Sequence, residues 1–353
     1  MGPTQTDTSD AAAWASALDV PEEAVELYRR CDVIDLHIDS FIWSRILGYD
    51  LRARHRWTPT GRRYLGQVDI PRALDANLTG GMWSITTNPF RPASARRRAF
   101  TKNLTRLKSV LDSDDRVSRV RNVAEYRAAR AEGRHGAFIA IQGGNALSAV
   151  SDLDLCQGDV VRITLVHMTT SAWGETSSPF NRLSRIRGLT DLGREFVTGC
   201  NEKRILVDLA HISPQGFWDA VEVHDPSQPL IVTHTGVNAV KQIWRNLDDD
   251  QIRAVADSGG CVGVILHELF LGGDPPTVED FADHVEHLAN VGGADLPAIG
   301  TDLDGMVTPP SDLRGHAHLP RLVAVLLRRG WDTDRIRKVL AGNALRTISA
   351  LRG

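Results

Sequence analysis

Eight short apolar segments, each separated from the next by a stretch of helical character, constrain the fold of this 353-residue chain more than any other feature. They cover residues 33–39, 80–87, 136–142, 160–167, 205–211, 229–234, 261–267 and 296–302. They show little alternation of apolar and polar residues, which is typical of parallel strands buried on both faces. Eight strand–helix units predict an α/β fold, a (β/α)8 TIM barrel. A doubly wound sheet fits less well, because no glycine-rich phosphate loop follows the first strand.

The domain organisation follows from the same alternation. No low-complexity linker interrupts the chain, so a single TIM-barrel domain is expected over residues 1–353. The polar leader at residues 1–20 is expected to be flexible.

Composition narrows the partners and the compartment. The net charge is only −3 and the basic residues are scattered, which argues against nucleic acid or an anionic membrane surface as the main partner. No apolar run is long enough to cross a membrane, and no signal peptide is recognisable at the start. The four cysteines are far apart and lie in or beside apolar segments, as buried free thiols in a reducing compartment would. A cytoplasmic protein is therefore expected.

Polar side chains recur at the carboxyl ends of the predicted strands. They are His37, Asp39, Gln142, His167, His211, His234, His267 and Asp302. Catalytic groups of TIM barrels lie at this end of the barrel, so these side chains are expected to converge on one rim. A single histidine at a strand end is more often a hydrogen-bonded structural residue, but five of the 12 histidines occupy such positions. Imidazoles with carboxylates and no thiolate suit zinc in a catalytic site.

A series of motifs between Val33 and Arg346 carries a family resemblance. They are IDLHID, GGMWS, the Gly-Gly loop after the third strand, LVH, VDLAHIS, THTG, WRNLDDD, GTDLDG and LAGNALR. In this order they resemble the membrane (renal) dipeptidase family, zinc metallopeptidases of the amidohydrolase-like barrel superfamily. The resemblance implies a dipeptidase-like hydrolase that cleaves an amide bond in a small dipeptide or amino-acid-derived substrate with a free carboxylate.

The resemblance also implies a two-zinc site. Carried over by position, His37, Asp39 and Asp302 would hold the first zinc, and His211 and His234 the second. Two-metal hydrolases of this kind place their ions about 3.5–4 Å apart around a bridging oxygen.

Three residues take other roles by the same resemblance. Asp302 would also move a proton from the attacking water to the leaving amine. His167 would polarise the scissile carbonyl, and Arg245 would bind the carboxylate at the end of the substrate. His267 has no metal role in the family pattern; it is expected either to line the substrate pocket or to be structural.

Gln142 departs from the family pattern, in which the bridging ligand is a glutamate. A glutamine offers one neutral oxygen and an amide nitrogen that cannot ligate. Two divalent ions about 3.5 Å apart repel by roughly 19 kcal/mol at an effective dielectric constant near 20, and a neutral bridge offsets less of this repulsion. One firmly bound zinc, with a second that is weak or absent, is therefore expected. Asn145 is a milder departure, since a histidine is common at its place.

Three functions remain open from the sequence. The leading one is the zinc-dependent dipeptidase-like hydrolase. Gln142 favours the second, a specialised biosynthetic or one-metal enzyme on the same scaffold. The third is a non-catalytic binding protein, against which Asp302, His167 and Arg245 argue. Dimers are common in the family, so a homodimer is compatible with the resemblance, although no motif indicates it.

Overall fold

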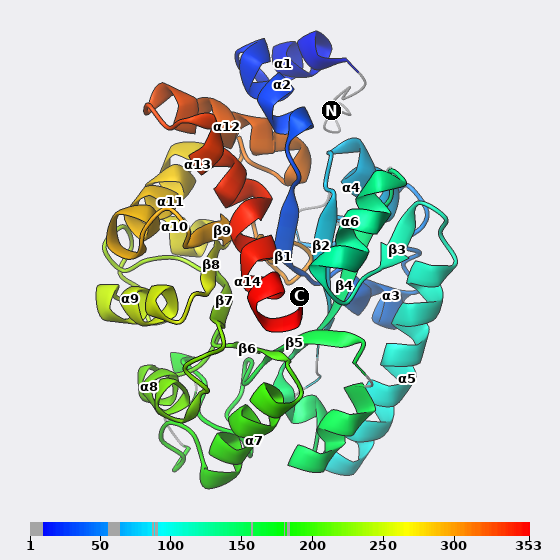
Figure 1. The fold of residues 1–353 in the computed structure, drawn as a ribbon, viewed down its shortest axis with the longest axis vertical. Coiled ribbons are helices and arrows are strands. Elements are labelled where there is room, and N and C mark those ends of the chain that lie inside the picture. Colours follow the sequence, from blue (N-terminus) through cyan, green and yellow to red (C-terminus); the bar gives the residue numbers. More distant parts are fainter. Residues whose placement is uncertain are drawn as a thin grey trace.

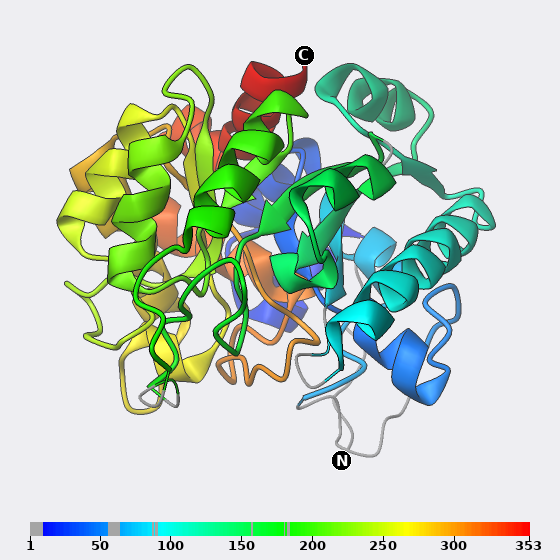
Figure 2. The ribbon, with the colours of Figure 1, turned by 90° about the horizontal axis from the view of Figure 1, so that it is seen from below.

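Eight parallel strands close into a barrel and helices surround it (Figures 1 and 2), which confirms the predicted TIM barrel. The computed structural model describes residues 10–55, 64–86, 88, 91–156, 158–179, 181 and 184–353. The barrel strands are β1 (Ile34–Ile38), β2 (Gly80–Thr86), β4 (His135–Gln142), β5 (Val160–Thr164), β6 (Leu206–Asp208), β7 (Leu230–Thr235), β8 (Cys261–Val264) and β9 (Pro297–Ile299). Because β2 pairs with β1 and β4, and β1 pairs with β9, every barrel strand has a neighbour on both sides.

The helices lie between and around the strands. They are α1 (Ala11–Leu18), α2 (Glu22–Arg30), α3 (Phe41–Leu47), α4 (Ile70–Asp75), α5 (Ala93–Asp112), α6 (Val123–Ala131), α7 (Asp191–Glu202), α8 (Pro214–Val223), α9 (Asp249–Asp257), α10 (Glu268–Leu271), α11 (Val278–Gly292), α12 (Leu319–Arg328), α13 (Thr333–Arg337) and α14 (Asn343–Arg352). Local sequence sets several of their starts. At α9, for example, Asp248 accepts a hydrogen bond from the backbone of Gln251, whose side chain accepts one from the backbone of Asp248 in return.

Two elements differ from the sequence-based expectations. A short strand, β3 (Val117–Arg119), pairs with the start of β4 outside the barrel, and three residues are too few for a periodic signal. Within the leader expected at residues 1–20, Ala11–Leu18 forms the helix α1, which packs Trp14 edge-on against Tyr28 at 5.6 Å. Residues 1–9, and Thr87 at the predicted end of the second strand, lie outside the described residues.

The barrel interior changes from apolar to polar towards the carboxyl ends of the strands. The apolar part contains Ile34, Leu36, Met82, Phe138, Leu206 and Ile231, packed with Ala344 and Ile348 of α14, which lies across the barrel in Figure 1. Polar residues join this part towards the mouth: Arg162 is in register with Ala140 and Leu206, and Thr164 is in register with Gln142 and Asp208. Residues in register on parallel strands face the same side, so these polar groups form a layer directly beneath the barrel mouth.

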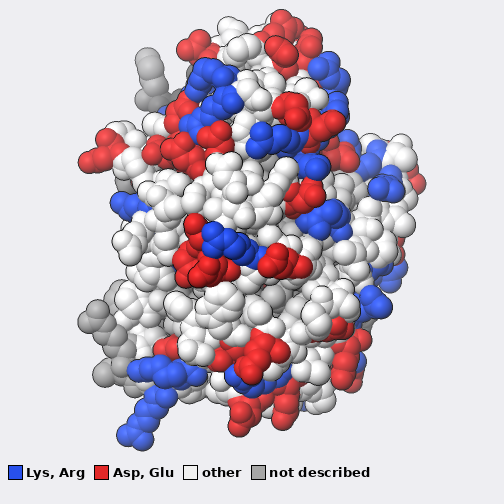
Figure 3. Space-filling model, turned by 60° about the vertical axis from the view of Figure 1, so that its left-hand side comes forward, with Lys and Arg blue, Asp and Glu red and all other residues white. Residues whose placement is uncertain are grey.

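Charged side chains of both signs are interspersed on the face shown in Figure 3. Many are paired: Arg329, for example, lies 2.7 Å from Glu279 and 2.6 Å from Glu286. Within the part of the chain that the structure describes, none of the helices combines the length and the apolar character that crossing a bilayer requires.

Candidate metal centre

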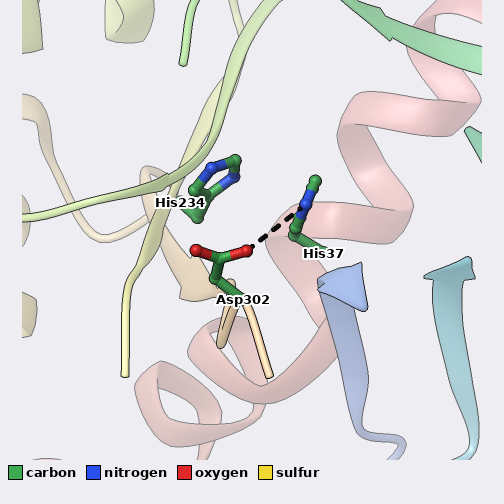
Figure 4. A group of neighbouring side chains, drawn as sticks. All are labelled: His37, His234 and Asp302. Carbon is green, nitrogen blue, oxygen red and sulfur yellow. Dashed lines mark ion pairs between the residues drawn. The ribbon is translucent and has the colours of Figure 1, made fainter. Parts of the chain in front are cut away.

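Three of the predicted ligands meet at the barrel mouth: His37 from β1, His234 from β7 and Asp302 from the loop after β9 (Figure 4). One ligand atom of each lies within 4.8 Å of the others. His37 Nε2 is 3.5 Å from Asp302 Oδ1 and 3.4 Å from Asp39 Oδ1. Asp302 Oδ1 is buried and has no hydrogen-bond partner among the described residues. A buried carboxylate oxygen without a partner, beside imidazole nitrogens, has the donor chemistry that a divalent cation completes.

His211 extends this cluster from the loop after β6. Its Nε2 atom lies 2.9 Å from His234 Nε2, and burial lowers the pKa of both rings well below the ordinary value, so both are neutral. The Thr233 hydroxyl donates to Asp208 at 2.7 Å, and can therefore only accept from His234 Nδ1 at 2.8 Å. This places the proton of His234 on Nδ1 and leaves the Nε2 lone pair facing the cluster, as a metal ligand requires.

Two candidate ligands, His211 and Asp302, have backbone angles that are incompatible with a β-strand. His211 and Asp302 have φ angles of 68° and 57°, in the left-handed region that residues with a side chain rarely adopt. Such strain is typical of functional sites held by their surroundings. The corresponding strands end three residues earlier than predicted, at Asp208 and Ile299. The strands before His167 and His267 likewise end at Thr164 and Val264.

Gln142, the last residue of β4, lies between the candidate ligands. Its side chain is satisfied at both ends when the amide nitrogen faces Asp39 Oδ2 at 2.7 Å and the oxygen faces His37 Nε2 at 3.2 Å. In this orientation the amide oxygen also lies 3.4 Å from His211 Nε2. Gln142 therefore stands where a ligand could bridge two ions, but it is neutral and its nitrogen is directed at Asp39.

His167 and Arg245 border the cluster. The His167 ring packs edge-on against His211 with centroids 4.7 Å apart, and burial lowers its pKa to about 4. Its Nδ1 atom is buried and unpaired within the described residues. Arg245 donates to the carbonyl of His234 at 2.8 Å. Burial lowers the pKa of Arg245 to about 10, which still leaves the guanidinium charged at neutral pH.

His267 takes no part in the cluster. Its Nδ1 atom accepts a long hydrogen bond of 3.4 Å from the backbone of Leu269 at the start of α10, and its ring lies 5.5 Å from that of Phe270. These contacts agree with a structural role for His267, and its role in lining the substrate pocket stays a prediction.

Arg162 is the main site residue that the sequence did not single out. Its fully buried guanidinium donates to His37 Nδ1 at 2.8 Å and to Thr164 Oγ1 at 2.6 Å, and lies 3.4 Å from Asp208. Arginine is almost never fully buried unless it is paired. A lone arginine within the apolar segment VVRITLVH is the signal that could have revealed it.

Known proteins share both this fold and this sequence pattern. The uncharacterized protein in the pqqA 5' region of Klebsiella pneumoniae is 36% identical over 166 residues, which are 46% of this chain and 60% of that protein. The probable dipeptidase PvdM from Pseudomonas aeruginosa superposes with a TM-score of 0.83 at 18% identity, covering 94% of this chain and 98% of that one. A metallo peptidase from Rhodobacter sphaeroides, liganded with a phosphinate mimic of the dipeptide L-Ala-D-Ala, gives 0.79 at 23% identity, covering 91% and 99%.

At these identities the superpositions establish the shared fold. The sequence profile of the family described as membrane dipeptidase (peptidase family M19) matches residues 21–352, which is nearly the whole chain. This match confirms the resemblance drawn from the motifs, and the chain belongs to the membrane dipeptidase family, peptidase family M19.

Proposed function

We propose that this chain is a zinc-dependent dipeptidase-like hydrolase that cleaves an amide bond in a small dipeptide or amino-acid-derived substrate with a free carboxylate. The observation that carries the proposal is the convergence of His37, His234 and Asp302 within 4.8 Å at the barrel mouth. Membership of the M19 family supports it, as does the dipeptide mimic bound to the Rhodobacter relative.

The donor set assigns the residues that would hold the metal. His37, Asp39 and Asp302 would hold one ion, and His211 and His234 a second. When bound, the metal would polarise the carbonyl and lower the pKa of the attacking water. Because Gln142 adds no negative charge between these two groups, one ion is expected to bind firmly and the second weakly or not at all.

The protein's own groups supply the proton and the positioning. Burial, followed by the negative charge of Asp39, raises the pKa of Asp302 well above the ordinary value, which suits a carboxyl that takes up a proton and passes it to the leaving amine. Neutral His167 would donate an N–H to the oxygen of the scissile carbonyl. Arg245 keeps its charge and would bind the terminal carboxylate of the substrate through its planar fork.

A panel of L-L and L-D dipeptides, assayed with added zinc, tests the proposal. Hydrolysis that a chelator abolishes and zinc restores is the expected result. Absence of hydrolysis across the panel, in protein shown to be folded and to contain zinc, would contradict it. A large gain of activity in Gln142→Glu would instead favour the specialised enzyme, whose natural residue suppresses dipeptide hydrolysis.

A further inference from the structure

A cavity of about 550 Å³ is lined largely by the loop that follows β5 and His167. Met168, which directly follows His167, forms part of its wall. Most of the rest is polar and neutral, with Thr169, Ser171 and Asn181 among the lining residues. Arg96 of α5 is the one charged residue among the described residues that line this cavity.

Arg96 keeps hydrogen-bonding capacity that the described residues do not use. Its Nε atom is buried without a partner, and no carboxylate of the described chain forms an ion pair with it. One terminal nitrogen donates to the amide oxygen of Asn145 at 2.9 Å, in the orientation that lets the Asn145 nitrogen donate to the carbonyl of Gly143 at 3.3 Å. A guanidinium held by a neutral amide retains its full charge, so it can bind an anion.

Asn145 ties Arg96 to the catalytic rim. It follows Gln142 by three residues. Gly143, with a φ of 97°, turns the chain at the end of β4, so Asn145 stays near the end of that strand. Asn145 is also one of the two departures from the family pattern. The structure gives this departure a role: it positions a cation that faces the cavity.

Arg96 and Arg245 lie over different parts of the barrel mouth. Arg96 contacts Asn145, which follows β4, and the cavity that it lines is walled by the loop after β5. Arg245 donates to the carbonyl of His234 in β7, and β4 and β7 are three positions apart among the eight barrel strands. A substrate whose terminal carboxylate is bound by Arg245 would extend its other end across the mouth towards Arg96.

We infer that the cavity at Arg96 is a second anion-binding subsite, and that the preferred substrate is a dipeptide with an acidic side chain on the residue N-terminal to the scissile bond. The inference rests on the proposed dipeptidase function and narrows its substrate class. The Ser171 hydroxyl accepts from the backbone of Trp173 at 3.2 Å, so its own proton is available to the same carboxylate. Glu175, which accepts a hydrogen bond from Asn181, is itself paired with Arg187 at 3.2 Å.

An isosteric pair of substrates tests the subsite. We expect the zinc-loaded protein to hydrolyse L-Glu-L-Ala with a kcat/KM at least about tenfold higher than that for L-Gln-L-Ala, because a charge-assisted hydrogen bond to a half-buried guanidinium is lost with the amide. Arg96→Gln should remove this preference, mainly through KM. Arg98→Gln, on the exposed face of the same helix, should keep it. Thermal unfolding of both variants checks that each is folded.

The outcomes distinguish failure of the Arg96 subsite from failure of the proposed dipeptidase activity. Equal hydrolysis of the two dipeptides, or a preference that survives Arg96→Gln, overturns the subsite and leaves the dipeptidase standing. Hydrolysis of neither, together with none across the L-L and L-D panel, overturns the dipeptidase. Calorimetric titration of the metal-free protein with the same two dipeptides then decides the subsite: tighter binding of L-Glu-L-Ala that Arg96→Gln abolishes supports it, and equal binding overturns it.

Discussion

The guanidinium of Arg162 donates a hydrogen bond to His37 Nδ1 over 2.8 Å, from inside the barrel. Arginine is only a donor, so Nδ1 of His37 must accept, and the ring proton lies on Nε2, the atom that faces Asp39 and Asp302. A metal ion bound at Nε2 would take the place of this proton. His234 is held in the opposite way, since its Nδ1 donates to the Thr233 hydroxyl. Asp208 joins the two arrangements, because it accepts from Thr233 at 2.7 Å and lies 3.4 Å from Arg162. The rings of two candidate ligands are therefore oriented by one buried network.

Replacing Arg162 should destabilise the protein strongly. Arg162→Met keeps much of the side-chain volume but leaves Asp208 buried without its cation, which typically costs about 3–5 kcal/mol. Urea unfolding of the metal-free protein measures this loss. Arg52→Met is the matched control, because it removes an exposed arginine paired with Asp50, and an exposed ion pair of this kind contributes little to stability. Similar losses in the two variants would show that the network adds little to stability.

Restoring a carboxylate between the candidate ligands should raise the metal content. After dialysis against a mild chelator, we expect about one zinc per chain in the natural protein and about two in Gln142→Glu, because the added negative charge offsets the repulsion between the ions. Elemental analysis gives the count. Gln251→Glu, which preserves the cap of α9, serves as the control and should leave the count unchanged. Two tightly held ions in the natural protein would contradict the expectation.

Asp302→Asn should separate the proton-transfer role from the shape of the site. The amide matches the carboxyl in size but can neither carry the negative charge nor shuttle a proton, so activity should fall by about 10²- to 10⁴-fold. Zinc content should fall as well, because Asp302 belongs to the ligand cluster. Circular dichroism of the variant checks that the fold is retained. A variant with full activity would remove Asp302 from the mechanism.

The barrel and most of its rim could be predicted because the signals are local. Apolar segments mark the strands, and a polar residue at a strand end predicts the rim, which singles out His37, His234 and Asp302, the three that the structure brings within 4.8 Å of one another. The same pattern cannot distinguish a histidine that turns into the site from one such as His267, which caps the following helix. Deciding between these requires the backbone angles after the strand, which depend on tertiary packing.

Other features depend on contacts between distant parts of the chain. Arg162 is stabilised by Asp208 and by His37, 125 residues away, and no spacing rule connects them. Trp14 is buried because α2 and the segment after the barrel supply its partners, including the carbonyl of Ala317 at 3.0 Å. A polar leader gives no sign of this docking.

A buried histidine away from the candidate site should make stability depend on pH. Trp83 donates from Nε1 to His135 Nε2 at 3.0 Å, and His135 Nδ1 lies 2.8 Å from the carbonyl of Leu78. The ring therefore accepts at one nitrogen and donates at the other, as only neutral imidazole can. A second proton on the ring would lie on Nε2 and would face the indole N–H of Trp83. Burial accordingly lowers the pKa of His135 from 6.5 to about 4.

The sign of the effect follows from where each state takes up the proton. The unfolded chain protonates this histidine near pH 6.5 and the folded protein only near pH 4, so its contribution is complete above pH 6.5 and is lost as the pH falls towards 4. At about 1.4 kcal/mol per pKa unit, the loss approaches about 3 kcal/mol. Urea unfolding of the metal-free protein from pH 7 to 4.5 should show a shallower pH dependence in His135→Gln. Equal slopes in the natural protein and in His135→Gln would mean that His135 is protonated in the folded state at a pH well above 4.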